Sequence, residues 1–203
     1  MRGHFRRFLL GAATVAVSSI PLLSATTTYQ IDSRHSDAQF AVTHLMISTV
    51  RGEIHGITGT MVYDDGDVSK SSVNAAIDAT TVDTREPDRD KHLKSGDFFD
   101  VANHPTMTFK STKVESAGAG KLKVTGDLTI RGVTKTVVLE VTVPKAPIKD
   151  PWGQQRTAIS GTTKINRQDF GVAWNKNLDS GGVMIGDNVD ITLDVEMFIS
   201  QAK

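Results

Sequence analysis

The sequence predicts an all-β domain, an antiparallel eight-stranded barrel with one short helix near residues 85–95. Three observations support this fold. Apolar and polar residues alternate along most of the chain after residue 25, as expected of strands with one buried face. Short links rich in glycine, aspartate and proline separate the alternating segments, and strands joined by such links run antiparallel. A single segment has the features of a helix.

The alternating segments define the expected strands in chain order. With the glycine-containing segment 52–63 included, they number about eight, and a barrel of that size is wide enough to hold one small ligand if its interior is not filled by large side chains. The inward positions of the remaining segments are Ala38, Phe40 and Val42; Val73, Ala75, Ile77 and Ala79; Met107 and Phe109; Leu122, Val124, Gly126, Leu128 and Ile130; Val137, Leu139, Val141 and Val143; Thr157, Ile159, Gly161, Thr163 and Ile165; and Val189, Ile191, Leu193, Val195 and Met197.

Turn residues and one helix complete the expected domain. The turns are predicted at 64–66, 118–120, 131–132, 151–153 and 180–182. A helix is expected from Glu86 to Lys94, with Thr84 as its cap, aspartates near its start and lysines near its end. Trp152 lies in a proline-bounded loop, where we expect it to anchor the loop.

The first 25 residues are predicted to be a signal peptide, followed by one domain over 26–203. Arg2, Arg6 and Arg7 precede an apolar run from Phe8 to Leu23, which is too short and interrupted for a membrane span, and Ala25 is the expected last residue before cleavage. The adjacent arginines also fit twin-arginine export, but ordinary Sec export is favoured. The expected location is the periplasm or the exterior of the cell.

Charge and composition exclude several classes of function. The chain has 23 basic and 23 acidic residues, so removing three arginines leaves 20 minus 23, or −3. A mildly acidic balance of mixed signs predicts binding neither to nucleic acid nor to an anionic membrane surface. Stable membrane insertion is not expected either. The chain has no cysteine, which excludes disulfides, thiol chemistry and a lipidated cysteine.

Six blocks of sequence resemble the YceI-like polyisoprenoid-binding family. The most distinctive is HLKSGDFFDVANHPTMTFKS, residues 92–111, and the others cover 29–45, 50–61, 126–135, 165–172 and 186–198. The departures are Ile54-His55, where an aromatic is expected after Gly52, and the loop from Pro144 to Gln155. The resemblance implies a lipocalin-like barrel that holds a long isoprenoid chain in its interior. Oligomeric state stays open, although members of the family are often homodimers.

Small residues at five inward positions favour an open interior. They are Ala38, Ala75, Ala79, Gly126 and Gly161. From the residues alone, glycines that mark barrel bends and alanines that fit its taper explain the pattern equally well. The resemblance to the family favours a lumen. For each residue expected to line that lumen, ordinary packing in the core is the alternative role. Strand parity and four aromatics near an expected mouth select Phe40, Val42, Val73, Ile77, Phe98, Phe99, Met107, Phe109, Leu128, Leu139, Ile159, Ile165, Phe170, Trp174, Ile191 and Leu193.

Three polar side chains are candidates for contact with a lipid head group. Arg89 and His92 belong to the charged helix, whose alternative role is a solvated surface, and Arg167 has as its alternative a structural pairing with Asp169 or a carbonyl. No histidine pair has the spacing of a zinc site, so no metal is expected. Neither a catalytic triad nor a nucleophile elbow is present in the sequence pattern.

The predicted function is therefore to bind and sequester or transport a polyprenol, a polyprenyl phosphate or a prenylquinone, with no cofactor other than that lipid. Two alternatives stay open. One is an enzyme that uses His35 or His92 as acid or base on an isoprenoid lipid. The other is a stress-response or interaction module whose barrel is filled.

Overall fold

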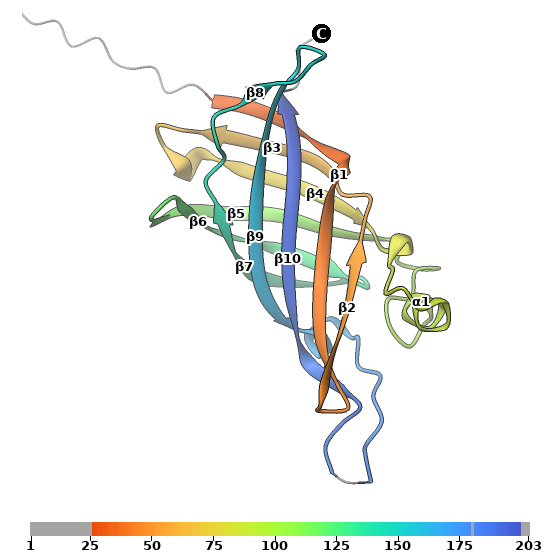
Figure 1. Cartoon of the computed structure of the whole chain (residues 1–203). Helices are drawn as coiled ribbons and strands as arrows, with labels where there is room; N and C mark the ends of the chain where they lie inside the picture. The colour runs from red at the N-terminus through yellow and green to blue at the C-terminus, as the bar shows by residue number, and fades with distance from the viewer. Residues whose placement is uncertain (1–25, 180, 200–203) are drawn as a thin grey trace, which may run out of the picture.

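The computed structural model describes residues 26–179 and 181–199, which form a closed antiparallel barrel (Figure 1). The predicted signal peptide, residues 1–25, lies outside the described residues. Eight strands make the wall, and two short strands, β2 and β8, flank it. The strands are β1 (Thr26–His44), β2 (Ser48–Ile54), β3 (Thr58–Asp64), β4 (Ser72–Asp78), β5 (Thr106–Gly118), β6 (Lys121–Ile130), β7 (Val133–Thr142), β8 (Ile148–Lys149), β9 (Gln155–Asn166) and β10 (Ile185–Ile199).

The order of pairing around the wall is β10, β1, β3, β4, β5, β6, β7, β9, and a ladder between β9 and β10 closes it. The predicted strand segment 52–63 is divided into β2 and β3, which pair with the second and first halves of the long strand β1. The seam between β7 and β9 has only two paired positions, Glu140 with Thr162 and Val141 with Gly161. The predicted antiparallel barrel is thus confirmed.

Turn chemistry explains two of the tightest hairpins. Arg131 and Gly132 both have positive φ, 50° and 73°, as a two-residue turn that matches the strand twist requires. Gly118, Ala119 and Gly120 likewise have positive φ between β5 and β6. Period-two alternation continues on both sides of each turn, so the turns fix which face of each strand points inward.

The short helix α1 (Pro87–Lys94) lies where the sequence predicts it, but its cap differs from the prediction. Glu86, not Thr84, is the N-cap, because its carboxylate accepts hydrogen bonds from the backbone N–H groups of Asp88 and Arg89. Thr84 instead donates its N–H and hydroxyl to Asp90. The other helical turns are short 3₁₀ segments at Val68–Lys70, Ala79–Thr81 and Arg167–Phe170. Within the described residues, no helix is long and apolar enough to span a membrane.

Arg156 on β9 joins three segments that are far apart in the sequence. Its Nη1 lies 2.6 Å from both Asp32 on β1 and Glu196 on β10, and its Nε lies 2.8 Å from Asp150 beside β8. Burial disfavours the charged form of Asp32, but the hydrogen bonds from Arg156 and His35 outweigh it and lower the pKa of Asp32 to about 2. The network thus braces the end of the barrel where β1, β9 and β10 meet.

The turn after β8 contradicts the expectation for Trp152. Its side chain is 86% exposed and anchors nothing, and Ile148 on β8 is 70% exposed. The ordering of this turn comes from Asp150, whose carboxylate accepts the backbone N–H groups of Trp152 and Gln154. The exposed tryptophan is therefore held in place by its neighbours, not by its own packing.

Replacement of Asp32 by asparagine should lower stability in a way that depends on pH. The folded-state pKa of Asp32 lies below its ordinary value of about 3.9, so its contribution is complete above about pH 4 and is lost as the pH falls toward 2. We expect Asp32→Asn to reduce the free energy of unfolding by about 2 kcal/mol at pH 6 and by progressively less below pH 4. Urea titrations across this range measure it, with exposed Asp194→Asn as the control. A loss that does not change with pH would contradict the account.

Candidate functional site

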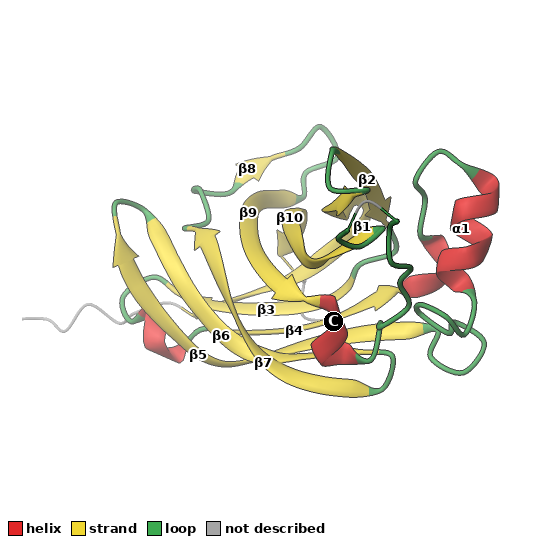
Figure 2. Ribbon diagram, turned by 90° about the horizontal axis from the view of Figure 1, so that it is seen from below, coloured by secondary structure: helices red, strands yellow, loops and turns green. Residues whose placement is uncertain are grey.

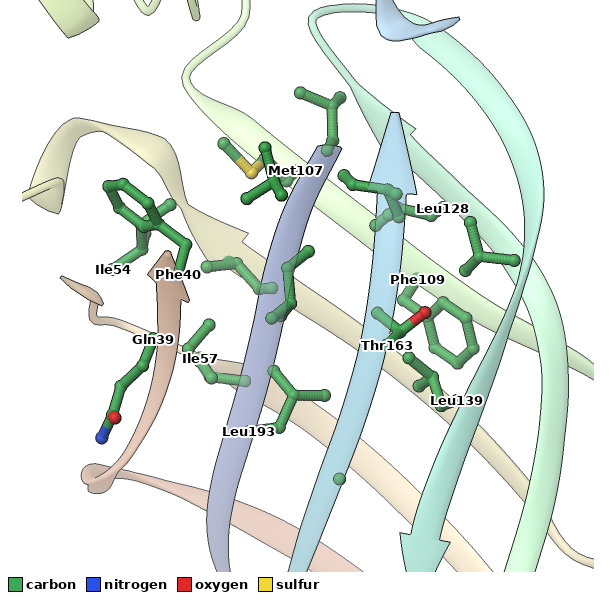
Figure 3. Close-up of a pocket in the computed structure, with 18 of the residues that line it drawn as sticks. Gln39, Phe40, Ile54, Ile57, Met107, Phe109, Leu128, Leu139, Thr163 and Leu193 are labelled. Carbon is green, nitrogen blue, oxygen red and sulfur yellow. The ribbon is translucent and has the colours of Figure 1, made fainter. Parts of the chain in front are cut away.

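The inward faces of the strands enclose a cavity of about 560 Å³. It runs from α1 at one end of the barrel to the last residues of β7 at the other. The surface of its wall is mainly apolar, and polar residues such as Gln39, Ser72 and Thr163 also line it. In Figure 3, Phe40, Met107, Leu128 and Leu193 approach this space from different strands. The volume falls within the range of about 300–1,000 Å³ that is usual for small-molecule sites.

All sixteen residues selected from the sequence as a lumen lining lie on the wall of this cavity. Their participation in ligand binding stays a prediction. Several other wall residues are not among these sixteen. Leu122, Val124 and Val141 were assigned to inward faces by their alternation but not chosen as lining. Six others had no inward face assigned from the sequence, and they lie on the first half of β1, on β2 and β3, and in the link between β2 and β3: Ile31, Val50, Ile54, Ile57, Met61 and Tyr63.

The five small inward residues do not all leave free space. Ala38, Ala75 and Gly161 line the cavity, as a lumen requires. Gly126 does not, because the ring of Phe109 from the neighbouring strand fills its position, and a Cβ there would lie 2.4 Å from Phe109 Cζ. Ala79 is fully buried in the 3₁₀ turn after β4 and is not on the cavity wall. The prediction that Gly126 and Ala79 leave free space in a lumen is therefore wrong.

The α1 end of the cavity carries a cluster of three rings. His92 makes edge-on contacts with Phe98 and Trp174, with ring centroids 4.9 Å and 4.8 Å apart, and its Nε2 lies 2.8 Å from Asp97. The cluster joins the α1 segment to the loop after the last 3₁₀ turn. Figure 2 shows α1 standing beside the barrel. His92 therefore has both a packing contact and a polar group at the cavity rim.

Arg89 is the second polar residue at this end of the cavity. Its Nε donates to the hydroxyl of Thr84 and its Nη2 donates to the Thr84 carbonyl, at 2.7 Å and 2.9 Å. These two bonds orient the half-buried guanidinium, which also lines the cavity. Asp88 lies on the same rim. An oriented cation beside an apolar cavity is suited to hold an anionic or hydroxyl head group.

Arg167, the third candidate, has a structural role in this geometry. It is 5% exposed and donates to the carbonyls of Gly186, Val172, Trp174 and Ile185, with Asp187 3.5 Å from its Nη2. Burial lowers the pKa of Arg167, and the nearby Asp187 opposes this shift. The sequence left open a structural role in which Arg167 pairs with a carbonyl or with Asp169. The hydrogen bonds to carbonyls are present, but the acidic residue beside Arg167 is Asp187, not Asp169. Contact with a head group would require Arg167 to exchange one of these bonds.

A possible metal-binding geometry lies outside the cavity. Potential ligand atoms of Asp32, His35 and Glu196 lie within 4.8 Å of one another. The guanidinium of Arg156, however, contacts both carboxylates at 2.6 Å, so a cationic group already lies between them. The cluster is accounted for by the bracing network described above.

Comparisons with known proteins identify the domain and its fold. A family model described as the YceI-like domain matches residues 29–197. A UPF0312 protein of Vibrio parahaemolyticus is 37% identical over 169 residues, which cover 82% of this chain and 89% of that protein. The crystal structure of Burkholderia cenocepacia BcnA superposes with a TM-score of 0.71 at 22% identity, over 82% of this chain and 98% of the other. A polyisoprenoid-binding domain from Saccharophagus degradans gives 0.62 at 16% identity, over 86% and 99%.

Substitution of the two glycines tests which of them borders free space. We expect Gly161→Ala to be neutral or to stabilise by up to about 1 kcal/mol, because a Cβ there lies at an ordinary 3.4 Å from Val141 and restricts the unfolded chain. Gly126→Ala should destabilise by about 1–3 kcal/mol, since it displaces the Phe109 ring. Chemical denaturation measures both. Equal effects would contradict the assignment of the cavity wall.

Proposed function

The chain belongs to the YceI-like family, and from this membership and its apolar cavity we propose that it binds one isoprenoid lipid inside the barrel. The observation that carries the proposal is a cavity of about 560 Å³ whose wall comes from strands all around the barrel and has a mainly apolar surface. Each methylene moved from water into such a wall contributes about 0.8 kcal/mol. A chain of several isoprene units therefore has ample driving force after the cost of ordering it.

Binding of this kind selects a chain by its length and branching more than by polar groups. We assign the head group to the α1 end, where Arg89 and His92 lie at the rim, and the hydrocarbon to the rest of the cavity. Suitable ligands are a polyprenol, a polyprenyl phosphate or a prenylquinone. Together with the predicted signal peptide at 1–25, this indicates a carrier that sequesters or transports lipid in the periplasm or outside the cell.

The two alternative functions differ in how well the geometry supports them. The cavity of about 560 Å³ supports an open interior over a filled barrel. An enzyme that used His35 would need this side chain at the lipid, but His35 bonds Asp32 in the bracing network and is not on the cavity wall. His92 does lie on the wall, and its contacts with Phe98 and Trp174 suit a packing role. We therefore favour a carrier over a catalyst.

A bulky residue at position 161 should block the cavity. Gly161 faces the lumen on β9, so Gly161→Phe is expected to weaken binding of a fluorescent polyprenol at least tenfold, through loss of the buried volume that the chain needs. Thr162→Phe makes a similar change one residue away, on the exposed outer face. It should leave affinity unchanged. The proposal fails if both variants bind the probe as the original chain does, provided that both are folded by circular dichroism.

A neutral residue at position 89 should discriminate between head groups. Arg89→Gln is expected to weaken binding of a polyprenyl phosphate about tenfold, through loss of a charge-assisted hydrogen bond, and to leave the matching polyprenol unaffected. Lys91→Gln removes the same charge from an exposed position of α1 and is the control. Isothermal titration with both lipids separates the outcomes. An equal loss for the two lipids would show that Arg89 supports the fold and not the head group.

A further inference from the structure

The segment around β8 has exposed apolar side chains that the cavity does not explain. We call residues 145–152 the β8 turn, which lies at the end of β9 and β10 opposite the β1–β2 turn in Figure 1. Trp152 is 86% exposed and Ile148 is 70% exposed, and Ala146, Pro147 and Pro151 are exposed with them. Exposed apolar side chains on one surface turn are a feature that interaction sites share, and the residues around them must indicate the partner.

The exposure of Trp152 is built into the fold. Asp150 accepts hydrogen bonds from the backbone N–H groups of Trp152 and Gln154 at 2.9 Å and 2.8 Å, and from Arg156 Nε at 2.8 Å. Gly153 has a φ of 91°, which allows the chain to turn sharply after the tryptophan. Because the turn is fixed at both ends, presenting the ring to a partner requires little further ordering of the chain.

The charges beside these apolar residues indicate what the partner is. Lys145 and Lys149 flank Ile148, both are exposed, and neither forms an ion pair with any residue of 26–179 or 181–199. Asp150, the acid of the β8 turn, is paired with Arg156. Tryptophan, an aliphatic residue and unpaired lysines together are the composition of segments that lie in the interface of a lipid bilayer. The mature domain is acidic overall, so any attraction to anionic head groups arises locally.

We propose that the β8 turn docks on the surface of a bilayer that contains anionic lipid, with Trp152 and Ile148 among the head groups. The turn continues directly into the cavity wall: Thr142 and Pro144 line the cavity just before it, and the Thr157 hydroxyl holds the Lys145 carbonyl at 2.8 Å. Docking thus brings the cavity end away from Arg89 and His92 to the membrane. Its use in lipid exchange rests on the proposed function, whereas the docking itself does not.

Flotation of the purified exported protein with vesicles tests this proposal. On vesicles of phosphatidylethanolamine and phosphatidylglycerol, the double variant Trp152→Ala/Ile148→Ala should lower the partition coefficient at least tenfold. Lys145→Glu/Lys149→Glu should lower it by a similar factor on these vesicles and far less on phosphatidylcholine, since two lysines contribute about thirtyfold at an anionic surface. The matched control, Met46→Ala/Ile47→Ala, removes two exposed apolar side chains from the β1–β2 turn and should change nothing.

Several results would overturn the proposal. In the first, the original chain does not float with the vesicles. In the second, the Trp152→Ala/Ile148→Ala variant floats as well as the original chain does. In the third, flotation is lost in the Met46→Ala/Ile47→Ala control instead. If sedimentation shows that the Trp152 variant converts a dimer to a monomer without changing flotation, the turn binds a second copy and the proposal fails. Uptake of polyprenol from detergent micelles, measured on the same variants, tests the proposed function separately. Failure of uptake with the flotation pattern intact would contradict only lipid binding.

Discussion

The small residues on the inner face of the barrel are the constraint on which the rest of this structure depends. An eight-stranded barrel can be filled by its own side chains or can hold one ligand, and the sizes of the inward residues decide between these outcomes. Ala38, Ala75 and Gly161 lie on three different strands, β1, β4 and β9, and all three line the cavity. The resulting cavity sacrifices packing contacts, because residues on its wall lack partners on one side. The fold must therefore obtain its stability elsewhere.

The wall and its ends supply that stability. The ladder between β9 and β10 has eleven paired positions and offsets the short seam between β7 and β9. At one end of the barrel, Arg156 forms ion pairs with β1, β10 and the segment after β8. At the other end, Arg167 donates hydrogen bonds to four backbone carbonyls. The rings of His92, Phe98 and Trp174 pack together at this second end. Polar networks thus lie at the ends of the barrel and apolar surface lies along its interior. This division allows an apolar chain to occupy the interior without leaving buried polar groups unpaired.

Most of the wall could be predicted from the sequence, because alternation fixes the face of every residue once a strand is recognised. What could not be predicted depends on contacts across strands or between distant segments. Gly126 has the same inward parity as Gly161, and only the register of β5 with β6 shows that Phe109 fills its space. The network of Arg156 joins residues 32, 150 and 196, and no spacing in the sequence indicates it. Glu86, not Thr84, caps the helix because α1 begins at Pro87, which places the Glu86 carboxylate beside the N–H groups of Asp88 and Arg89.

We propose the interior as the binding site and the two ends of the barrel as its boundaries. The proposal that the barrel holds an isoprenoid lipid is tested most directly by native mass spectrometry of the purified protein, followed by mass analysis of the organic extract. We predict a complex of one protein with one polyisoprenoid or prenylquinone, and recovery of that lipid unchanged. A protein that is empty as purified and also fails to take up added polyprenol would contradict the claim.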